Sequence, residues 1–109
     1  MATAGARNWG FVAVWEFRPK PGAEQRFEAT YGPQGIWASF FAAGKGFVAT
    51  ELNRDLKDPG RYLTFDFWTS KAAYDQFREA HADEYQRIDA QCEQLTAEEK
   101  LIGHFERLP

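Results

Sequence analysis

The two most apolar segments of this chain carry apolar side chains on both faces, and this limits the folds open to it. Segment 9–17 reads WGFVAVWEF and segment 61–68 reads RYLTFDFW. Both are rich in the aromatic and β-branched residues that favour strands. A strand covered on one side only would alternate apolar with polar residues. We therefore predict two strands in a sheet that is covered on both faces.

Between these strands the apolar residues follow a helical period. Ala23, Phe27 and Tyr31 recur every four residues, which indicates one face of a helix. Gly32-Pro33 interrupts this pattern, and a second helical segment follows. Its apolar residues are Ile36, Trp37, Phe40 and Phe41.

A second pair of strands and a second helix complete the chain. Residues 47–53 (FVATELN) predict a strand that forms an antiparallel hairpin with 61–68. Ser70 is the expected N-cap of a long helix, either straight or kinked. The apolar face of this helix is Tyr74, Phe77, His81, Tyr85, Ile88, Cys92 and Leu95. Residues 96–99 (TAEE) fit a capping box and predict a single short helical turn before a last strand at 101–106.

The resulting order is strand–helix–strand–strand–helix–strand, an α+β domain. We expect this domain to span residues 9–109, after a flexible N-terminus at residues 1–8. The helices can cover one face of the sheet, and no remaining segment can cover the other. A second copy of the chain would cover it in a symmetric homodimer paired through the sheet face. The alternative is a monomer core that uses Phe where other proteins use Leu or Ile.

Composition narrows the function classes. The net charge is −3 and the basic residues are scattered, which disfavours nucleic acid and anionic membranes as partners. Cys92 is the only cysteine, and His81 and His104 share no short spacing with acidic residues, so no metal motif is present. No segment approaches the roughly 20 apolar residues of a membrane span, and no signal peptide is evident. We predict a cytoplasmic protein without metal or cofactor.

One motif adds a family resemblance. Trp68-Thr69-Ser70-Lys71-Ala72-Ala73-Tyr74 follows the third strand, and Pro21-Gly22 forms a turn after the first. With the order of elements, these residues resemble the antibiotic biosynthesis monooxygenase family of the dimeric α/β-barrel superfamily, over roughly residues 9–107. The resemblance implies a ferredoxin-like βαββαβ fold, with an antiparallel four-stranded sheet and helices on one face.

The resemblance also implies a pocket between helices and sheet. In family members that oxidise aromatic polyketides, an Asn, a Trp and a Tyr assist the direct reaction of a substrate carbanion with O₂, without flavin or metal. Trp68 and Tyr74 match the Trp and the Tyr. Thr64 occupies the position of the Asn. Its single hydroxyl lacks the separate donor and acceptor of an amide, so this mechanism does not transfer unchanged. The histidine of the haem-degrading branch, about ten residues after the Trp, has no match.

Asp66 is the most informative candidate, because it lies in mid-strand between aromatic neighbours. Burial would raise its pKa and make it a general base. The alternatives are an ion pair with Arg61, Arg54 or a residue of the other subunit, or simple exposure near the pocket mouth. Trp68 is either a pocket wall or a core ring, and Tyr74 either donates its hydroxyl to a substrate or belongs to the core. The expected pocket-lining residues are Thr64, Trp37, Phe41 and His104, although a lone histidine is more often structural.

Three functions follow from this pattern. The first is a cofactor-independent monooxygenase acting on a small aromatic or polycyclic molecule. The second is a non-catalytic dimeric domain that binds such a molecule, and the third is a purely structural dimer. A pocket of roughly 300 Å³ or more favours the first two, whereas a cleft closed by its own side chains favours the third.

Overall fold

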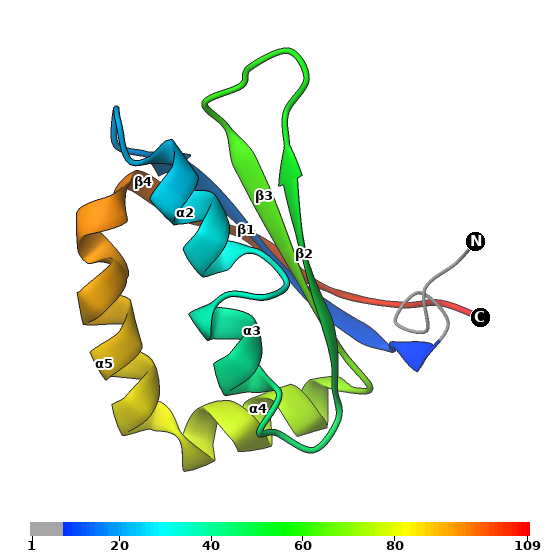
Figure 1. The fold of residues 1–109 in the computed structure, drawn as a ribbon. Coiled ribbons are helices and arrows are strands. Elements are labelled where there is room, and N and C mark those ends of the chain that lie inside the picture. The colour runs from blue at the N-terminus through cyan, green and yellow to red at the C-terminus, as the bar shows by residue number, and fades with distance from the viewer. Residues whose placement is uncertain (1–7) are drawn as a thin grey trace.

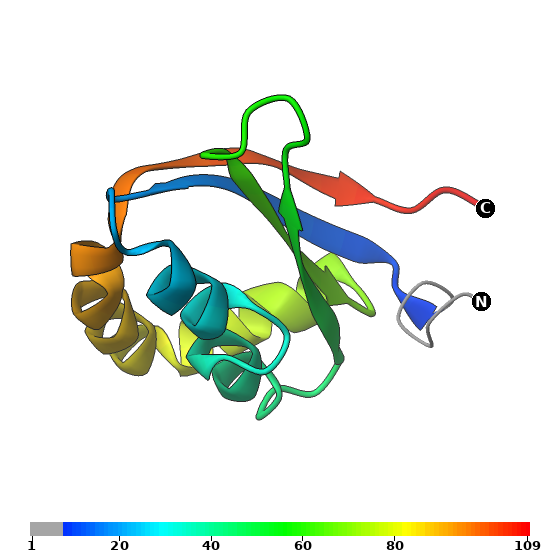
Figure 2. The ribbon, with the colours of Figure 1, turned by 45° about the horizontal axis from the view of Figure 1, so that its top comes forward.

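A four-stranded antiparallel sheet with helices on one face organises residues 8–109, the part of the chain that this computed structural model describes. In chain order the elements are β1 (Phe11–Pro19), α2 (Glu24–Tyr31), α3 (Ile36–Phe41), β2 (Phe47–Arg54), β3 (Tyr62–Trp68), α4 (Lys71–Ala80), α5 (Ala82–Cys92), the 3-10 turn η1 (Glu93–Leu95) and β4 (Thr96–Glu106). The strand order is β2-β3-β1-β4. Figures 1 and 2 show all the helices on the same side of the sheet. The predicted α+β fold is confirmed; the flexible segment predicted at 1–8 lies outside the described residues except for Asn8.

Alternation along β3 assigns its side chains to the two faces. The helix-facing residues Tyr62, Thr64, Asp66 and Trp68 are buried, whereas Leu63, Phe65 and Phe67 between them are half-buried on the outer face. Each lies in register with a residue of β1 on the same face, for example Phe65 with Val14. The prediction that both faces are largely apolar is therefore correct.

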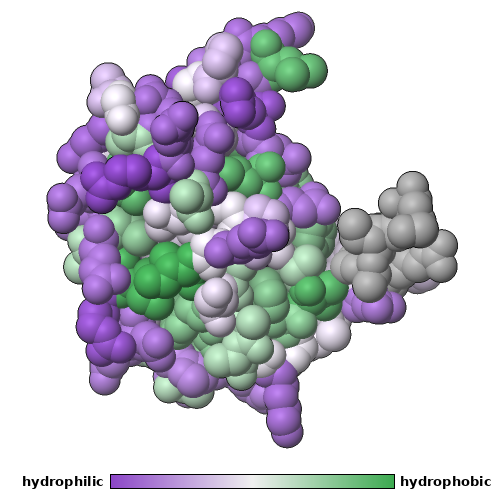
Figure 3. All heavy atoms as spheres, viewed as in Figure 1, coloured by the Kyte–Doolittle hydropathy of each residue, from purple (hydrophilic) through white to green (hydrophobic). Residues whose placement is uncertain are grey.

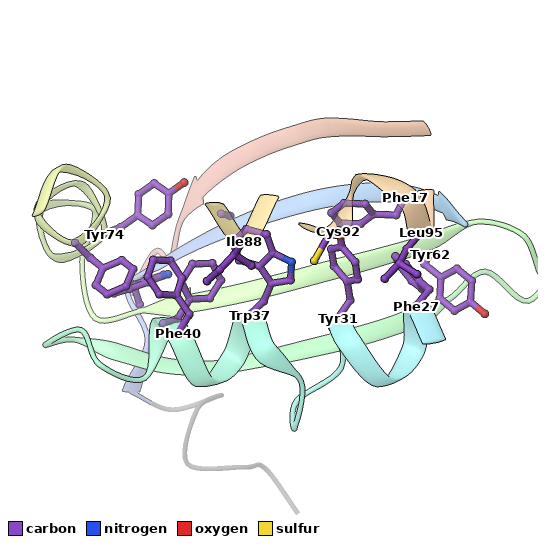
Figure 4. Close-up of a cluster of buried hydrophobic side chains, with 14 of the residues drawn as sticks. Phe17, Phe27, Tyr31, Trp37, Phe40, Tyr62, Tyr74, Ile88, Cys92 and Leu95 are labelled. Atoms are coloured by element: carbon purple, nitrogen blue, oxygen red, sulfur yellow. The ribbon is translucent and has the colours of Figure 1, made fainter. Parts of the chain in front are cut away.

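The core between sheet and helices is built from aromatic rings (Figure 4). Phe27 of α2 stacks on Tyr31 at 4.5 Å between ring centroids, and Trp37 of α3 packs 5.8 Å from Phe41. Ring pairs at such distances add to the free energy gained by burial. Figure 3 shows the outside of this helical layer, hydrophilic along α5 and more apolar over α3.

The long helix predicted from Ser70 onward is present in kinked form, as α4 and α5. The backbone breaks between them at His81, which has φ −121° and ψ 30°. Ser70 does cap α4, since its Oγ accepts a hydrogen bond from the N–H of Ala73 at 3.0 Å.

The helical turn predicted at residues 96–99 is wrong. These residues open β4 instead and lie beside β1, where Glu98 is in register with Arg18 and forms an ion pair with it at 3.5 Å. The capping-box pattern was outweighed by strand pairing, a tertiary interaction that local sequence does not reveal. The sheet is consequently longer at this edge than predicted.

The outer face of the sheet carries a band of apolar side chains, which we call the outer apolar face. Its members are Trp9, Val12, Val14, Leu63, Phe65, Phe67 and Phe105. Phe105 on β4 is 48% exposed, and none of the helices covers this side. Ile102, which a bulge leaves without a partner on β1, is also exposed.

Candidate active site

A narrow cavity lies between the sheet and the helices. The volume that the centre of a water molecule can occupy in it is about 40 Å³. The whole space between the surrounding atoms, including the part that opens to solvent, is about 500 Å³. Seven aromatic residues line it: Trp15, Phe17, Tyr31, Trp37, Phe41, Tyr74 and Tyr85. Its polar lining residues are Thr50, Thr64, Asp66, Asp89 and Glu99. The cavity is therefore lined mainly by aromatic rings, with three carboxyl groups among its polar residues.

Asp66 is the deepest charged group of the cavity. The residue is 8% exposed, and Thr50 Oγ1 donates to its Oδ1 at 2.7 Å. Within residues 8–109, Oδ2 accepts no hydrogen bond, and it is not among the fully buried atoms without a partner. Since Asp66 lines the cavity, this oxygen is accessible from it. Burial raises the pKa of Asp66 to about 6, against the lowering effect of the Thr50 hydrogen bond. Such a carboxylate is a suitable general base near neutral pH.

Neither Arg61 nor Arg54, the two arginines considered as partners within the chain, pairs with Asp66. Arg61 Nε binds Glu16 Oε1 at 2.7 Å, and Arg54 lies 3.4 Å from Glu28. Glu16 belongs to the outer face of β1, in register with Leu63, so it does not pair with Asp66 across the cavity. The carboxylate of Asp66 thus has no neutralising partner in the described structure.

The cavity brings together five of the seven residues named from the sequence. They are Asp66, Tyr74, Thr64, Trp37 and Phe41. Trp68 does not line it: the ring is fully buried, 5.3 Å from the ring of Phe77, and its Nε1 has no hydrogen-bond partner. His104 lies outside as well, with its ring 5.4 Å from that of Tyr74. Desolvation lowers the pKa of His104, and the charge of Lys71 adds to this effect.

His104 belongs to a second hollow, which we call the outer groove. This groove of about 410 Å³ is open at the surface between the helices and β4. It shares Tyr74 and Tyr85 with the inner cavity, and Arg78 lies between the two rings. Arg78 Nη1 donates to the Tyr74 hydroxyl at 2.8 Å, and its guanidinium carbon is 3.8 Å from the Tyr85 ring centroid. These three side chains separate the cavity from the groove.

Sequence reasoning missed several lining residues, including Asp89 and Glu99. Glu99 was assigned to a helical turn, whereas it faces the cavity from β4, in register with Phe17. Burial raises the pKa of Glu99, and the charges of Asp89 and Glu93 raise it further. Alternation counted back from His104 places Glu99 on the opposite face, and it reaches the cavity because of the register shift opposite Val14 and Trp15, which the local sequence does not reveal.

Within residues 8–109, no three His, Cys, Asp or Glu side chains come close enough together to hold a metal ion. No helix in that range combines the length and the apolar character needed to cross a membrane.

The geometry can now be set beside known proteins. The sequence model of the family described as "Antibiotic biosynthesis monooxygenase" matches residues 10–91. The chain belongs to the antibiotic biosynthesis monooxygenase family. The matched range includes both strands of the hairpin, Asp66 and the Trp68–Tyr74 motif. Among curated proteins, none matches the sequence significantly.

Solved structures share the fold of this family member. A candidate antibiotic biosynthesis monooxygenase from Deinococcus radiodurans superposes with a TM-score of 0.66 at 18% identity, covering 91% of this chain and 93% of that one. One from Nitrosomonas europaea gives 0.66 at 17%, covering 93% and 92%. One from Bordetella bronchiseptica gives 0.62 at 22%, covering 92% and 99%. At these identities the comparison supports the ferredoxin-like fold alone.

Proposed function

We propose that this protein oxidises a small aromatic molecule with O₂, without a cofactor, and that Asp66 is the base that starts the reaction. The observation that carries the proposal is a buried carboxylate with one oxygen open to an aromatic cavity. Membership of the family supports the reaction class. The flat rings of Trp15 and Trp37 suit a planar ligand.

The chemistry needs only substrate, oxygen and a base. Asp66 removes an acidic proton from a phenol or its keto tautomer and leaves a carbanion. The carbanion gives one electron to O₂, and the radical pair combines to form a peroxide that takes up a proton. The hydroperoxide loses water and leaves a carbonyl. Overall, a ring CH₂ and O₂ give C=O and H₂O, so the substrate supplies all four electrons and no other reductant is required.

The inner cavity is small for this role as it stands, since its 40 Å³ lies below the roughly 300 Å³ of ordinary ligand pockets. It would reach that size by joining the outer groove. Tyr74 and Tyr85 line both the cavity and the outer groove, and Arg78 lies between their rings. Rotation of Tyr85 and Arg78 away from Tyr74 would therefore connect the cavity with the groove.

A non-catalytic binding domain is the second candidate function. Thr64, in place of an amide side chain, favours it, because a hydroxyl cannot make the paired contacts of an amide. A purely structural dimer would explain the small cavity and leaves the unpaired Asp66 oxygen without a role.

An oxygen electrode decides between these candidates. The purified protein is mixed with anthrone, 1-naphthol and 1,4-dihydroxynaphthalene, each corrected for autoxidation. Consumption by the wild type and its loss in Asp66→Asn would support the monooxygenase. Binding of these compounds without consumption would indicate the binding domain, and neither binding nor consumption would leave the structural dimer.

We also infer that the outer apolar face binds a second copy of the chain. Phe105 is exposed there and Phe65 and Phe67 are half-buried, and no helix of the described chain covers them. A two-fold pairing buries the same band on both copies. The cytoplasmic location remains a prediction from the sequence.

A further inference from the structure

Two carboxyl groups lie where the inner cavity opens to solvent. Asp89 of α5 is half-buried and Glu99 of β4 is exposed, and both line the cavity. The chain reverses through η1, which joins α5 to β4 (Figure 2). Burial raises the pKa of Glu99 and the charge of Asp89 raises it further, so the two carboxylates are close enough to repel each other. Neither forms an ion pair within residues 8–109.

Two polar groups deeper in the cavity point to a ligand independently. Thr64 is 4% exposed, and its hydroxyl makes no hydrogen bond in the described structure. This oxygen is not among the fully buried atoms, so it is accessible from the cavity that Thr64 lines. Asp66, two residues along the same face of β3, offers its Oδ2 in the same way. Buried polar groups normally have a hydrogen-bond partner, and a ligand that enters the cavity would supply one.

The lining of the cavity favours a positive charge on that ligand. Seven aromatic residues and three carboxyl groups line it, and no basic side chain does. Arg78 lies outside, in the outer groove, where it binds the Tyr74 hydroxyl. Carboxylates and aromatic ring faces both attract a cation. Within residues 8–109 no third ligand joins Asp89 and Glu99 to complete a metal site, so an organic ammonium group fits better than a metal ion.

The register of the sheet separates Asp66 from Glu99. Asp66 pairs with Ala13 of β1 and Glu99 pairs with Phe17, so their positions differ by about 13 Å along the sheet. Two strand spacings, about 10 Å, separate them across it. Both side chains extend toward the space between them. The cavity therefore suits an elongated molecule with a polar group at each end and an aromatic ring between.

We propose that the inner cavity binds a phenol that carries a protonated aminoalkyl side chain. The ammonium group lies between Asp89 and Glu99, the ring lies among the aromatic side chains, and the hydroxyl reaches Thr64 and Asp66. This assignment rests on the proposed function for its reaction but not for its binding step. It names the charge of the substrate, and it gives α5 and the start of β4 a role in recognition.

The test uses three phenols that differ in the charge at the end of a short side chain. At pH 7 tyramine is positive, 4-ethylphenol is neutral and 3-(4-hydroxyphenyl)propionate is negative. Isothermal titration calorimetry measures their dissociation constants at low salt. We expect tyramine to bind about tenfold more tightly than 4-ethylphenol, and the propionate to bind most weakly. High salt should reduce the preference for tyramine and leave 4-ethylphenol binding unchanged.

Variants at the opening of the cavity locate the charge. Asp89→Asn and Glu99→Gln should each lower the preference for tyramine over 4-ethylphenol about threefold, with 4-ethylphenol binding unchanged. Glu99→Lys should make the propionate bind more tightly than tyramine. Glu84→Gln is the matched control, because it removes the same charge from an exposed residue of α5 that lines neither the cavity nor the outer groove.

Three results would overturn the ammonium site. They are equal constants for tyramine and 4-ethylphenol in the wild type, a preference that falls as much in Glu84→Gln as in the other variants, and failure of all three phenols to bind. Asp89 and Glu99 lie outside the core, and should either variant fail to fold, the other variant and the salt dependence still decide.

The ammonium site and the monooxygenase fail in different ways. A preference for tyramine in a protein that consumes no oxygen with any phenol would leave the ammonium site standing and remove the monooxygenase. Consumption of oxygen with 1-naphthol, without a preference for tyramine, would remove the ammonium site and leave the monooxygenase.

Discussion

Thr50 donates a 2.7 Å hydrogen bond to Asp66 from the neighbouring strand, and it is the sole hydrogen-bond partner of that carboxylate in the described structure. The two residues lie directly in register on β2 and β3. A single hydroxyl offsets only part of the cost of burying a charge. The ionised form of Asp66 therefore destabilises the fold, and the pKa near 6 expresses this.

Replacing Asp66 by Asn should stabilise the protein above pH 6. The folded-state pKa of about 6 lies above the ordinary 3.8, so the favourable contribution of protonated Asp66 is complete below pH 3.8 and is lost as pH rises through 6. The stabilisation by Asp66→Asn at pH 8 should exceed that at pH 3.5 by roughly 3 kcal/mol. Urea unfolding at both pH values measures it, and equal effects at both would contradict the burial. Thr50→Val, which removes the hydrogen bond, should move the transition to higher pH.

The same group sets the pH dependence of turnover. A base works in its ionised form, so kcat/KM for any substrate found in the oxygen assay should rise about tenfold per pH unit below pH 6 and level off above it. Thr50→Val should shift the midpoint upward, since the hydrogen bond lowers the pKa. A profile that is flat from pH 5 to 8, measured with the same substrate, would exclude Asp66 as the base.

The β-strand side of the site could be predicted from sequence because side chains of a strand alternate. Alternation along residues 61–68 places Thr64 and Asp66 on the same face of one strand, and both line the cavity. The motif ending in Tyr74 placed a third lining residue. The fold followed from the same patterns, since each strand and helix boundary up to α4 lies within a residue or two of its prediction.

The rest depended on contacts between distant segments. Trp68 fits a family pattern, and yet the turn after β3 buries it under Phe77, away from the cavity. Glu99 faces the cavity because β4 pairs along β1 with two irregularities, and neither is written in the local pattern of residues 96–99.

Assembly should depend on the outer apolar face. Light scattering should give about twice the chain mass of 12.5 kDa for the wild type. Phe65→Lys and Phe67→Lys each place a charge where two copies would meet, and should shift the protein to monomer at micromolar concentration. Leu56→Lys, at an exposed loop residue, is the control and should stay dimeric. A wild-type monomer would overturn the inference.

Arg78 should control entry to the cavity. Arg78→Met keeps the length of the side chain but removes its bond to Tyr74 and its charge over the Tyr85 ring. We expect faster association of 1-naphthol, by about tenfold, with a loss of stability of about 1 kcal/mol. Stopped-flow fluorescence measures the association rate. Arg87→Met, on α5 but outside the cavity and the outer groove, is the matched control, and equal rates in wild type and both variants would contradict a gate.

Gly22 and Gly46 both have a positive φ, but only Gly46 is crowded. Alanine substitutions at the two positions therefore distinguish the cost of the backbone conformation from the cost of steric crowding. Gly22 has φ 87° and open space around it, so Gly22→Ala should cost about 1 kcal/mol through its backbone alone. Gly46 has φ 91°, and a Cβ there would lie 2.6 Å from Thr69 Oγ1 and 2.7 Å from Ala73 Cβ. Gly46→Ala should cost at least another 1 kcal/mol. Equal losses of unfolding free energy in the two variants, measured with urea, would contradict this and show that the turn before β2 shifts to accommodate the added Cβ.

The chain leaves the sheet beside the point where it enters. The N–H of Arg107 donates to the carbonyl oxygen of Gly10 at 2.9 Å, so β1 begins where β4 ends. A short linker between these ends and a new opening in the polar loop between β2 and β3 would give a circular permutant with the same sheet. Such a rearranged gene would start at β3, and the segment that carries Asp66, Trp68 and Tyr74 would be the first to leave the ribosome.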